Sequence, residues 1–410
     1  MWPRRSLGRG ALVATVLAAL GVARPAAARD APDRVSVLTM GPGDHPFTRF
    51  GHNAILLEWD TGGQSHDAVY NFGTFEFQGL QGARDFMSGR FRYWLSVTNL
   101  ERTVRAYAAD NRSLTAQELA LTRAERGELY GKLVESARPE QRYYAYDYYR
   151  DNCSTRVRDA IDDLLRGSLE RSVAGPGRLT FREHTLALTR DTAWLYVGLD
   201  LALGTPTDVP TTRWQELFLP QELHDALARA QRELDGERVS LVRKETQLAS
   251  ATRATLPREP TTPWLSLGGA GALLGATLAA LGHAARRGPT GRAVFGVVSA
   301  LLGGALGVLG SALAVFWASK HWAAHANRSL LACPPWALAL VVLGAGFALG
   351  RPGAARPLRL LLAASLATTA ALLVLSVVSS NHESLRIVAL FLPLWSGWLW
   401  GAERARPATR

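Results

Sequence analysis

The sequence predicts an α+β domain followed by an all-α membrane domain of about five transmembrane helices. Composition changes near residue 260: before this point the chain is charged and aromatic, and afterwards it is mostly Ala, Leu, Gly, Val and Trp between short arginine clusters. Within the first part, segments with strand periodicity precede segments with helical spacing. We therefore expect a folded domain of helices and strands attached to a membrane bundle.

Residues 1–28 predict a secretory signal that is removed. Arg4, Arg5 and Arg9 precede an apolar run, and three alanines end the segment at Ala28. The expected divisions are 1–28 signal peptide, 30–214 thiol domain, 215–262 amphipathic helix and linker, 263–401 transmembrane helices and 402–410 basic tail. Export is therefore expected for the domain that follows the signal.

Four segments of the first domain predict β-strands. Residues 34–40 (RVSVLTM) alternate between two sets of side chains, as a strand does. Residues 53–59 and 67–72 are expected to form a hairpin, because Gly62-Gly63 between them is a strong turn signal. Residues 91–97 (FRYWLSV) are β-rich in composition and predict a further strand.

Two segments of this domain predict helices. Thr115 and Glu118 have the spacing of a capping box, and leucines with helical spacing follow, so a helix is expected up to about Glu135. Cys153 opens a second segment with one apolar face. That helix is expected to end at Gly167, since glycine readily adopts the left-handed conformation beyond a helix.

The end of the first part predicts one more helix and a linker. Pro220 suits the first helical position, and residues 221–247 are charged with an amphipathic pattern. The proline-rich residues 255–264 are expected to form a hinge into the membrane.

Five apolar segments predict the transmembrane helices and their orientation. They are 264–281, 293–317, 335–349, 358–379 and 387–400, of which the third and fifth are shorter than the roughly 20 residues that a span needs. Arginines gather after the first, third and fifth segments, and the other loops hold only Lys320, Arg328 and Arg386. Arginine-rich loops stay in the cytoplasm. The protein is therefore expected in a bacterial inner membrane, with its first domain in the periplasm.

The net charge of +11 does not indicate nucleic-acid binding. Nine of the positive charges belong to the three arginine clusters of the membrane domain: Arg286, Arg287, Arg292, Arg351, Arg356, Arg359, Arg404, Arg406 and Arg410. Export also separates the first domain from nucleic acid. We interpret these charges as topology signals that also attract anionic lipid headgroups of the bilayer.

The two cysteines, Cys153 and Cys333, allow two interpretations. An even pair in an oxidising compartment is often a disulfide. However, Cys153 starts a helix among polar residues, whereas Cys333 lies in the apolar run LLACPPW, where cysteine usually acts as a small hydrophobe. We therefore favour separate roles for the two thiols.

Cys153 and His52 predict a cysteine nucleophile with a histidine base. A thiol in the first turn of a helix faces free backbone N–H groups and the positive end of the helix dipole, which favours thiolate. His52 opens an apolar strand and is expected within hydrogen-bond reach. For the group that orients the histidine we choose Asn71, with His66 and Asp67 as alternatives; a local backbone contact explains Asn71 equally well.

Polar side chains near Cys153 are candidates for substrate binding. Asn152 or Tyr149 is expected to supply the second donor to an oxyanion, although Asn152 is also well placed as a helix N-cap. Five tyrosines in residues 143–152 are expected to line one wall of the site. No metal site is predicted, because the nine histidines lack a metal-binding spacing, and no cofactor is expected.

Histidines outside this cluster are weaker candidates. His45 lies in a loop, where a histidine is usually only solvated. His321, His325 and Asn327 lie in the outer loop expected below the first domain, where they are candidates for a phospholipid headgroup or an acceptor amine. Polar residues that merely fill a loop are the alternative explanation.

Four runs of sequence resemble the Lnb-type amino-terminal periplasmic domain. They are FGHNAILLEWD (50–60), DAVYNFGTFEF (67–77), FMSGRFRYWL (86–95) and YDYYRDNCSTRVRDAID (146–162). The resemblance continues through Phe181, Arg182, Trp194, Gly198, Asp200, Gly204 and Asp208, and into the outer loop at 319–335. It implies a permuted papain-like or NlpC-like thiol fold, similar in its order to lecithin:retinol acyltransferase.

The resemblance also implies lipoprotein N-acyltransfer. Cys153 would take an acyl chain from a phospholipid donor, with His52 as the base, and pass it to the amino-terminal cysteine of a lipoprotein acceptor. Two alternatives remain open from the residues themselves. A cell-wall peptidase or amidase of NlpC type would explain the cysteine and histidine but not the membrane domain, and a non-catalytic sensor or scaffold would give Cys153 a structural role.

Overall fold

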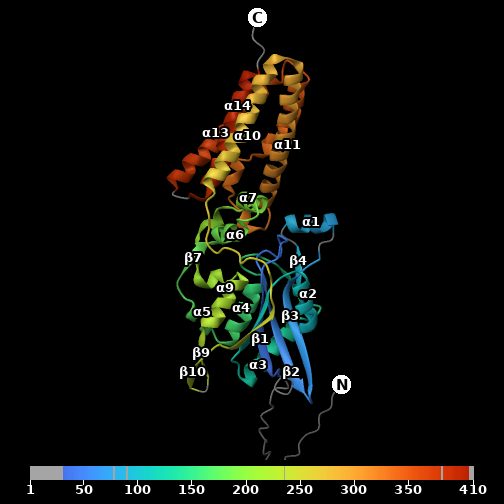
Figure 1. Ribbon diagram of the computed structural model, residues 1–410, viewed down its shortest axis with the longest axis vertical. Helices are drawn as coiled ribbons and strands as arrows, with labels where there is room; N and C mark the ends of the chain where they lie inside the picture. The colour runs from blue at the N-terminus through green and yellow to red at the C-terminus, as the bar shows by residue number, and fades with distance from the viewer. Residues whose placement is uncertain (1–30, 77–78, 89–90, 235, 380–381, 406–410) are drawn as a thin grey trace, which may run out of the picture.

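The computed structural model describes residues 31–76, 79–88, 91–234, 236–379 and 382–405. The expected signal peptide and most of the basic tail lie outside the described residues. The described chain forms an α/β domain with a seven-stranded sheet, followed by a bundle of long apolar helices (Figure 1). The two parts are stacked end to end along the long axis of the molecule.

The sheet has the strand order β11-β5-β1-β2-β3-β4-β6, and every neighbouring pair is antiparallel. Its strands are β1 (Arg34–Met40), β2 (His52–Thr61), β3 (Gln64–Thr74), β4 (Arg92–Thr98), β5 (Leu114–Leu119), β6 (Tyr143–Ala145) and β11 (Val242–Ala249). Two small hairpins pair β7 (Pro176–Thr180) with β8 (Pro210–Thr212) and β9 (Gln231–Leu234) with β10 (Glu237–Ser240). The strands predicted at 34–40, 53–59, 67–72 and 91–97 are confirmed.

Helices cover both faces of the sheet. The helices of this domain are α1 (Gly79–Met87), α2 (Leu100–Ala109), α3 (Arg123–Ser136), α4 (Cys153–Leu164), α5 (Ser168–Ser172), α6 (Phe181–Thr189), α7 (Ala193–Ala202), α8 (Arg213–Glu216) and α9 (Pro220–Arg229), with the 3₁₀ helix η2 (Thr205–Asp208). Apolar side chains of α3, α4 and α9 pack against one face, where Ile55 and Leu57 of β2 lie. The other face, with Ala54 and Leu56, packs against α2. Neighbouring residues of β2 thus point to opposite layers.

The predicted capping box at Thr115 was wrong. Residues 114–119 form β5, which pairs with β1 on one side and β11 on the other. The same motif recurs at Thr122 and Glu125, where each side chain bonds the backbone N–H of the other and α3 begins. Pairing on both sides satisfies the backbone of β5 in the sheet, which outweighs the local helix signal.

The helix predicted over residues 221–247 was also wrong beyond its first turns. Only Pro220–Arg229 is helical, and β9, β10 and β11 follow. Gly236, at φ +83°, lies in the turn between β9 and β10. Because β11 is an edge strand whose residues 243–247 are all exposed, its charged side chains resemble those of a surface helix in composition.

The bundle matches the expectation of about five spans in part. Its elements are α10 (Trp264–Ala284), η3 (Ala285–Arg287), α11 (Pro289–Ala318), η4 (Trp322–Ala324), η5 (Arg328–Leu331), η6 (Pro335–Leu338), α12 (Ala339–Ala348), α13 (Ala355–Val378), η7 (His382–Ser384) and α14 (Leu385–Arg404). Within the described residues, 4 helices are long and apolar enough to cross a membrane, or 5 if the pair Trp322–Leu331 and Pro335–Ala348, bent by 58°, counts as one span. The chain breaks at Pro334-Pro335 because proline lacks the N–H that a continuous helix needs.

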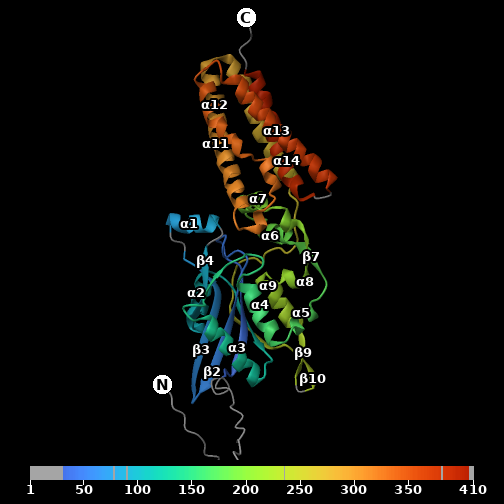
Figure 2. The same ribbon diagram turned by 180° about the vertical axis from the view of Figure 1, so that it is seen from behind.

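The broken segment runs back along α11. A Cβ atom at Gly310 would lie 2.4 Å from the carbonyl oxygen of Cys333, so the two backbones are in close contact. At the far end of the bundle, Arg292 lies beside Gly350, which brings two arginine clusters together. The last described helix, α14, ends at this same end, away from the first domain (Figure 2). The arginine-rich loops therefore lie opposite the first domain, as the alternation of charges predicted.

The loop after α11 joins the bundle to the first domain. The N–H of Gly204 donates to the carbonyl of Ala323 at 2.7 Å. The Asn327 amide donates to the carbonyl of Leu201 at 2.8 Å. A buried ion pair links Asp200 of α7 to Arg386 of α14, with 3.0 Å between Nε and Oδ2. Because these contacts are buried and polar, they fix how the two parts are joined.

Candidate active site

The helix that carries Cys153 is fixed in place by Asn152. The Oδ1 atom of Asn152 accepts from the N–H of Thr155, and the Thr155 hydroxyl accepts from the N–H of Asn152, which completes a capping box. Both protons of the Asn152 amide are used as well, in bonds to the carbonyls of Tyr148 and Phe218. The N-cap explanation is therefore correct, and no donor of Asn152 is left for an oxyanion.

Cys153 is the first residue of α4, and 7 % of its surface is exposed. The backbone N–H groups of Asn53 and Ser154 lie near its sulfur and favour the thiolate form. Burial nevertheless raises the pKa of the Cys153 thiol, because desolvation exceeds the effect of these donors and of the Arg112 cation. The sequence predicted that the helix start would favour the thiolate. In the structure, burial outweighs this effect and favours the neutral thiol, which therefore needs a base.

The sulfur reaches the sheet where β2 and β3 separate. Their pairing runs from Thr61 opposite Gln64 to Ile55 opposite Tyr70, and Asn53, whose N–H lies near the sulfur, is beyond the last paired residue. Gly73 has φ +88°, and a Cβ atom there would lie 3.7 Å from that of Cys153. The thiol at the start of α4 therefore lies at the end of the sheet where the central strands β2 and β3 separate.

His52 lies at the start of β2, next to Asn53, whose N–H lies near the thiol. The side chain of Asn71 in β3 lies close enough to act on its imidazole. Burial, and secondly the charge of Arg112, lower the pKa of His52 to about 4, although Asn71 acts in the opposite direction. His52 is therefore neutral at pH 7, and a neutral imidazole can accept a proton.

Asn71 is placed to orient the imidazole, while its two alternatives lie elsewhere. His66 pairs with Trp59 near the turn of the hairpin, at the opposite end of β2 from His52. Asp67 accepts from the N–H of Leu100 at the start of α2. Asn71 also donates to the carbonyl of Val69 at 3.3 Å, so the local contact considered from the sequence is present too.

Arg112 belongs to this site but was missed from the sequence. It precedes β5 and is only 5 % exposed. Its Nε donates to the carbonyl of Gly41 at 2.8 Å, and the guanidinium lies 4.5 Å from the centre of the Tyr107 ring. Its Nη2 is buried without a hydrogen-bond partner. An arginine in a polar turn carries no sequence signal for burial, because only the contact between β1, α2 and β5 encloses it.

The five tyrosines expected at one wall divide between several roles. Tyr146 lies close to Cys153, because a Cβ atom at Gly73 would be 3.3 Å from the Tyr146 ring and 3.7 Å from the Cys153 Cβ. Tyr149 is buried, and its hydroxyl bonds that of Thr185 at 2.8 Å, so it does not face open space. Tyr143 is 38 % exposed on β6. Only part of residues 143–152 therefore lines the site around Cys153.

The candidate residues of the outer loop are engaged with protein groups. His321 Nε2 bonds the carbonyl of Phe86 at 2.6 Å, and His325 Nε2 bonds that of Ser319 at 2.9 Å. Asn327 is buried, caps η5 through Ser329, and donates to the backbone of α7. These residues join the loop to its surroundings, and the structural explanation fits Asn327 best.

Both cysteines are free thiols. Cys333 is buried in the bundle, where its thiol donates to the carbonyl of Leu306 at 3.2 Å. His45 is exposed, and its Nδ1 accepts from the N–H of Phe47. Among the residues that the structure describes, no three metal-binding side chains are grouped to hold an ion.

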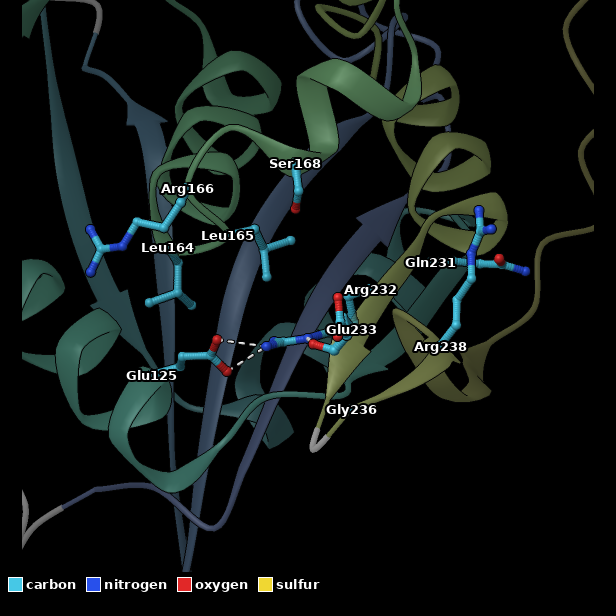
Figure 3. A pocket seen from close by; sticks show the side chains of 10 residues that line it. All are labelled: Glu125, Leu164, Leu165, Arg166, Ser168, Gln231, Arg232, Glu233, Gly236 and Arg238. Carbon is cyan, nitrogen blue, oxygen red and sulfur yellow. Dashed lines mark hydrogen bonds and ion pairs between the residues drawn. The ribbon is translucent and has the colours of Figure 1, made fainter.

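One described pocket lies away from Cys153. It has a volume of about 640 Å³ and is formed by the end of α4, the start of α3 and the hairpin of β9 and β10. Figure 3 shows that Glu125 and Arg232 pair across it. Its position at the opposite end of α4 from Cys153 separates it from the thiol chemistry.

The segment with His52, Asn71, Arg112 and Cys153 matches a known family. Residues 24–185 match the family model described as the Lnb N-terminal periplasmic domain. This domain belongs to the Lnb-type family. The Lnb-type domain is periplasmic, and the apolar helices after it make the chain a membrane protein with a periplasmic domain. Comparisons with curated proteins and with solved structures give no match.

Proposed function

We propose that this protein is a membrane-bound thiol acyltransferase of the bacterial inner membrane. Cys153 accepts an acyl chain from a phospholipid and transfers it to an amine, for which we propose the amino-terminal cysteine of a lipoprotein. The observation that carries the proposal is a buried thiol at a helix start, close to Asn53 of β2, whose neighbour in the strand is the neutral histidine His52. The proposed fold is a permuted papain-like or NlpC-like one, because the histidine strand precedes the cysteine helix in the chain.

The first half-reaction forms a thioester. The imidazole of His52 takes the proton of the thiol as the sulfur attacks the ester carbonyl of the phospholipid. The ester C–O bond then breaks, and the protonated imidazole gives its proton to the leaving alkoxide, which departs as a lysophospholipid. Backbone N–H groups at the start of α4 and the positive end of its dipole favour the negative charge that develops.

The second half-reaction forms an amide. A neutral amine attacks the thioester carbonyl, the C–S bond breaks, and the amine proton returns to the sulfur through His52. The net change is transfer of one acyl group from an ester oxygen to a nitrogen. Asn71 holds the imidazole in orientation during both steps, as the third member of a triad does.

The position of the thiol near the membrane domain supports a lipid donor. Asn152, next to Cys153, bonds Phe218, Phe218 packs on Tyr149, and Tyr149 packs on Trp322 of the outer loop. The indole of Trp322 in turn donates to Asp147, in the segment that leads to α4. A short series of contacts thus joins the nucleophile to the membrane helices, which a soluble cell-wall peptidase would not require.

The direct test follows the acyl group. Full-length protein in proteoliposomes is incubated with phospholipid labelled in its acyl chain. We expect a labelled adduct that hydroxylamine removes, because hydroxylamine cleaves thioesters. Cys153→Ala is expected to abolish the adduct, whereas Cys333→Ala, which removes the other buried thiol, is expected to retain it.

Each other outcome points to a different function. An adduct without transfer to a lipoprotein peptide would keep the thiol chemistry and exclude the proposed acceptor. Cleavage of peptidoglycan without an adduct would favour a peptidase. An equal adduct in Cys153→Ala would contradict the proposal.

A further inference from the structure

Aromatic rings form a continuous series between the thiol and the membrane helices. Centroid distances are 4.1 Å from Tyr146 to Tyr93 and 5.1 Å from Tyr93 to Phe75. They are 5.3 Å from Phe75 to Phe47, 6.5 Å from Phe47 to Phe86 and 6.2 Å from Phe86 to Phe316. We call these six residues, Tyr146, Tyr93, Phe75, Phe47, Phe86 and Phe316, the aromatic strip.

One end of the aromatic strip lies near the thiol, and the other lies at the membrane helices. Acyl transfer from a phospholipid must connect these two places. Tyr146 contacts Gly73, which lies beside Cys153. Phe316 belongs to the last turn of α11, one of the helices long enough to cross a membrane. Between them, Phe86 comes from α1, which lies level with the near end of the bundle in both views (Figures 1 and 2). Six separate segments of the chain therefore combine into one apolar surface.

The aromatic strip is not simply core. Phe47 is 52 % exposed, Tyr146, Phe75, Phe86 and Phe316 are each partly exposed, and Tyr93 is the one buried member, at 7 %. Contiguous exposed apolar surface on a folded protein usually marks a binding site. A peptide would also need polar partners for its backbone, whereas four of the six side chains are phenylalanines, which present only apolar ring surface.

We propose that the aromatic strip binds the acyl chain of the donor phospholipid and leads it from the outer leaflet to Cys153. This inference rests on the proposed acyl transfer and adds the route by which the chain leaves the bilayer. The rings replace the apolar surroundings that the chain loses, so the carbonyl reaches the sulfur while the chain remains out of water. The carbonyl then lies at the Tyr146 end, and the far end of the chain lies toward Phe316.

The test compares a long and a short acyl donor on the full-length protein in proteoliposomes. The long donor is dipalmitoyl phospholipid, and the short donor is p-nitrophenyl acetate, which is too small to use the strip. Phe47→Asp places a carboxylate on the strip at an exposed position, where the fold tolerates polarity. We expect palmitoyl adduct formation to slow by about tenfold or more, because a charge opposes an apolar chain, while acetyl adduct formation changes less than about twofold.

Two further variants control for charge and for fold. Tyr143→Asp introduces the same charge at an exposed aromatic residue that packs on Trp94, away from the strip, and is expected to leave both adducts unchanged. Phe47→Leu keeps the site apolar and is expected to restore the palmitoyl rate. The proposed route would be overturned if Phe47→Asp slowed adduct formation from both donors equally, or from neither. If wild type forms only the acetyl adduct, the strip does not deliver lipid; if it forms no adduct at all, the proposed function itself fails.

Discussion

Replacing His52 by glutamine is expected to slow formation of the Cys153 thioester by about 10²- to 10⁴-fold, the usual contribution of a general base. The reason is that burial raises the pKa of the thiol, so without a base the sulfur stays protonated. The measurement is the initial rate of hydroxylamine-sensitive adduct formation from labelled phospholipid. His66→Gln alters an exposed histidine of the same hairpin and serves as the matched control.

The pH dependence of the same rate distinguishes a base from a merely structural histidine. Because burial and Arg112 lower the pKa of His52 to about 4, the rate in wild type is expected to be flat through pH 6 to 8 and to fall only toward pH 4. Arg112→Gln removes a positive charge that disfavours imidazolium, so the acid limb is expected to move to higher pH. His52 would not be the base with the lowered pKa if the wild-type rate fell at the ordinary pKa of histidine and if Arg112→Gln did not shift this fall.

Replacing Asp200 by asparagine is expected to destabilise the protein by about 3–5 kcal/mol, as breaking a buried ion pair typically does. Asp200 is 2 % exposed. It accepts from Arg182 of α6 at 3.0 Å and from Arg386 of α14 at 3.0 Å. The substitution removes the negative charge that two buried arginines share. Arg182 belongs to the periplasmic domain and Arg386 to the bundle. The measurement is the free energy of unfolding of detergent-solubilised protein, followed by tryptophan fluorescence.

Two comparisons show whether the loss comes from the buried pair. Glu101→Gln breaks an ion pair whose two side chains are both 75 % exposed, and it is expected to cost less than about 1 kcal/mol. The double variant Asp200→Leu with Arg386→Leu removes one buried charge of each sign, leaves Arg182 paired with Asp208, and is expected to be less destabilised than Asp200→Asn. Equal stability of Asp200→Asn and wild type would show that the junction does not depend on this pair.

Local sequence patterns predicted most of the helices and strands correctly. They failed where a segment with a helix signal is paired as a strand in the sheet. The strands from 34 to 97 alternate regularly, so each could be predicted without its neighbours. Thr115 and Thr122 begin the same capping motif, and only pairing with β1 and β11 shows that the first lies in a strand. Likewise β11 resembles a surface helix until its partner β5 is known. Long-range pairing is not encoded in local periodicity, so these assignments required the fold.

The sequence by itself determined that this chain has an Lnb-type domain with a cysteine at a helix start and a histidine at a strand start, followed by apolar helices whose arginines alternate between loops. Only the tertiary structure decided that Arg112 is buried near them, that Asn152 is a cap with no free donor, and that distant phenylalanines form one strip. The physical reason is that ionisation, hydrogen-bond saturation and shared apolar surface depend on neighbours in space. Strands and helices far apart in the chain supply those neighbours.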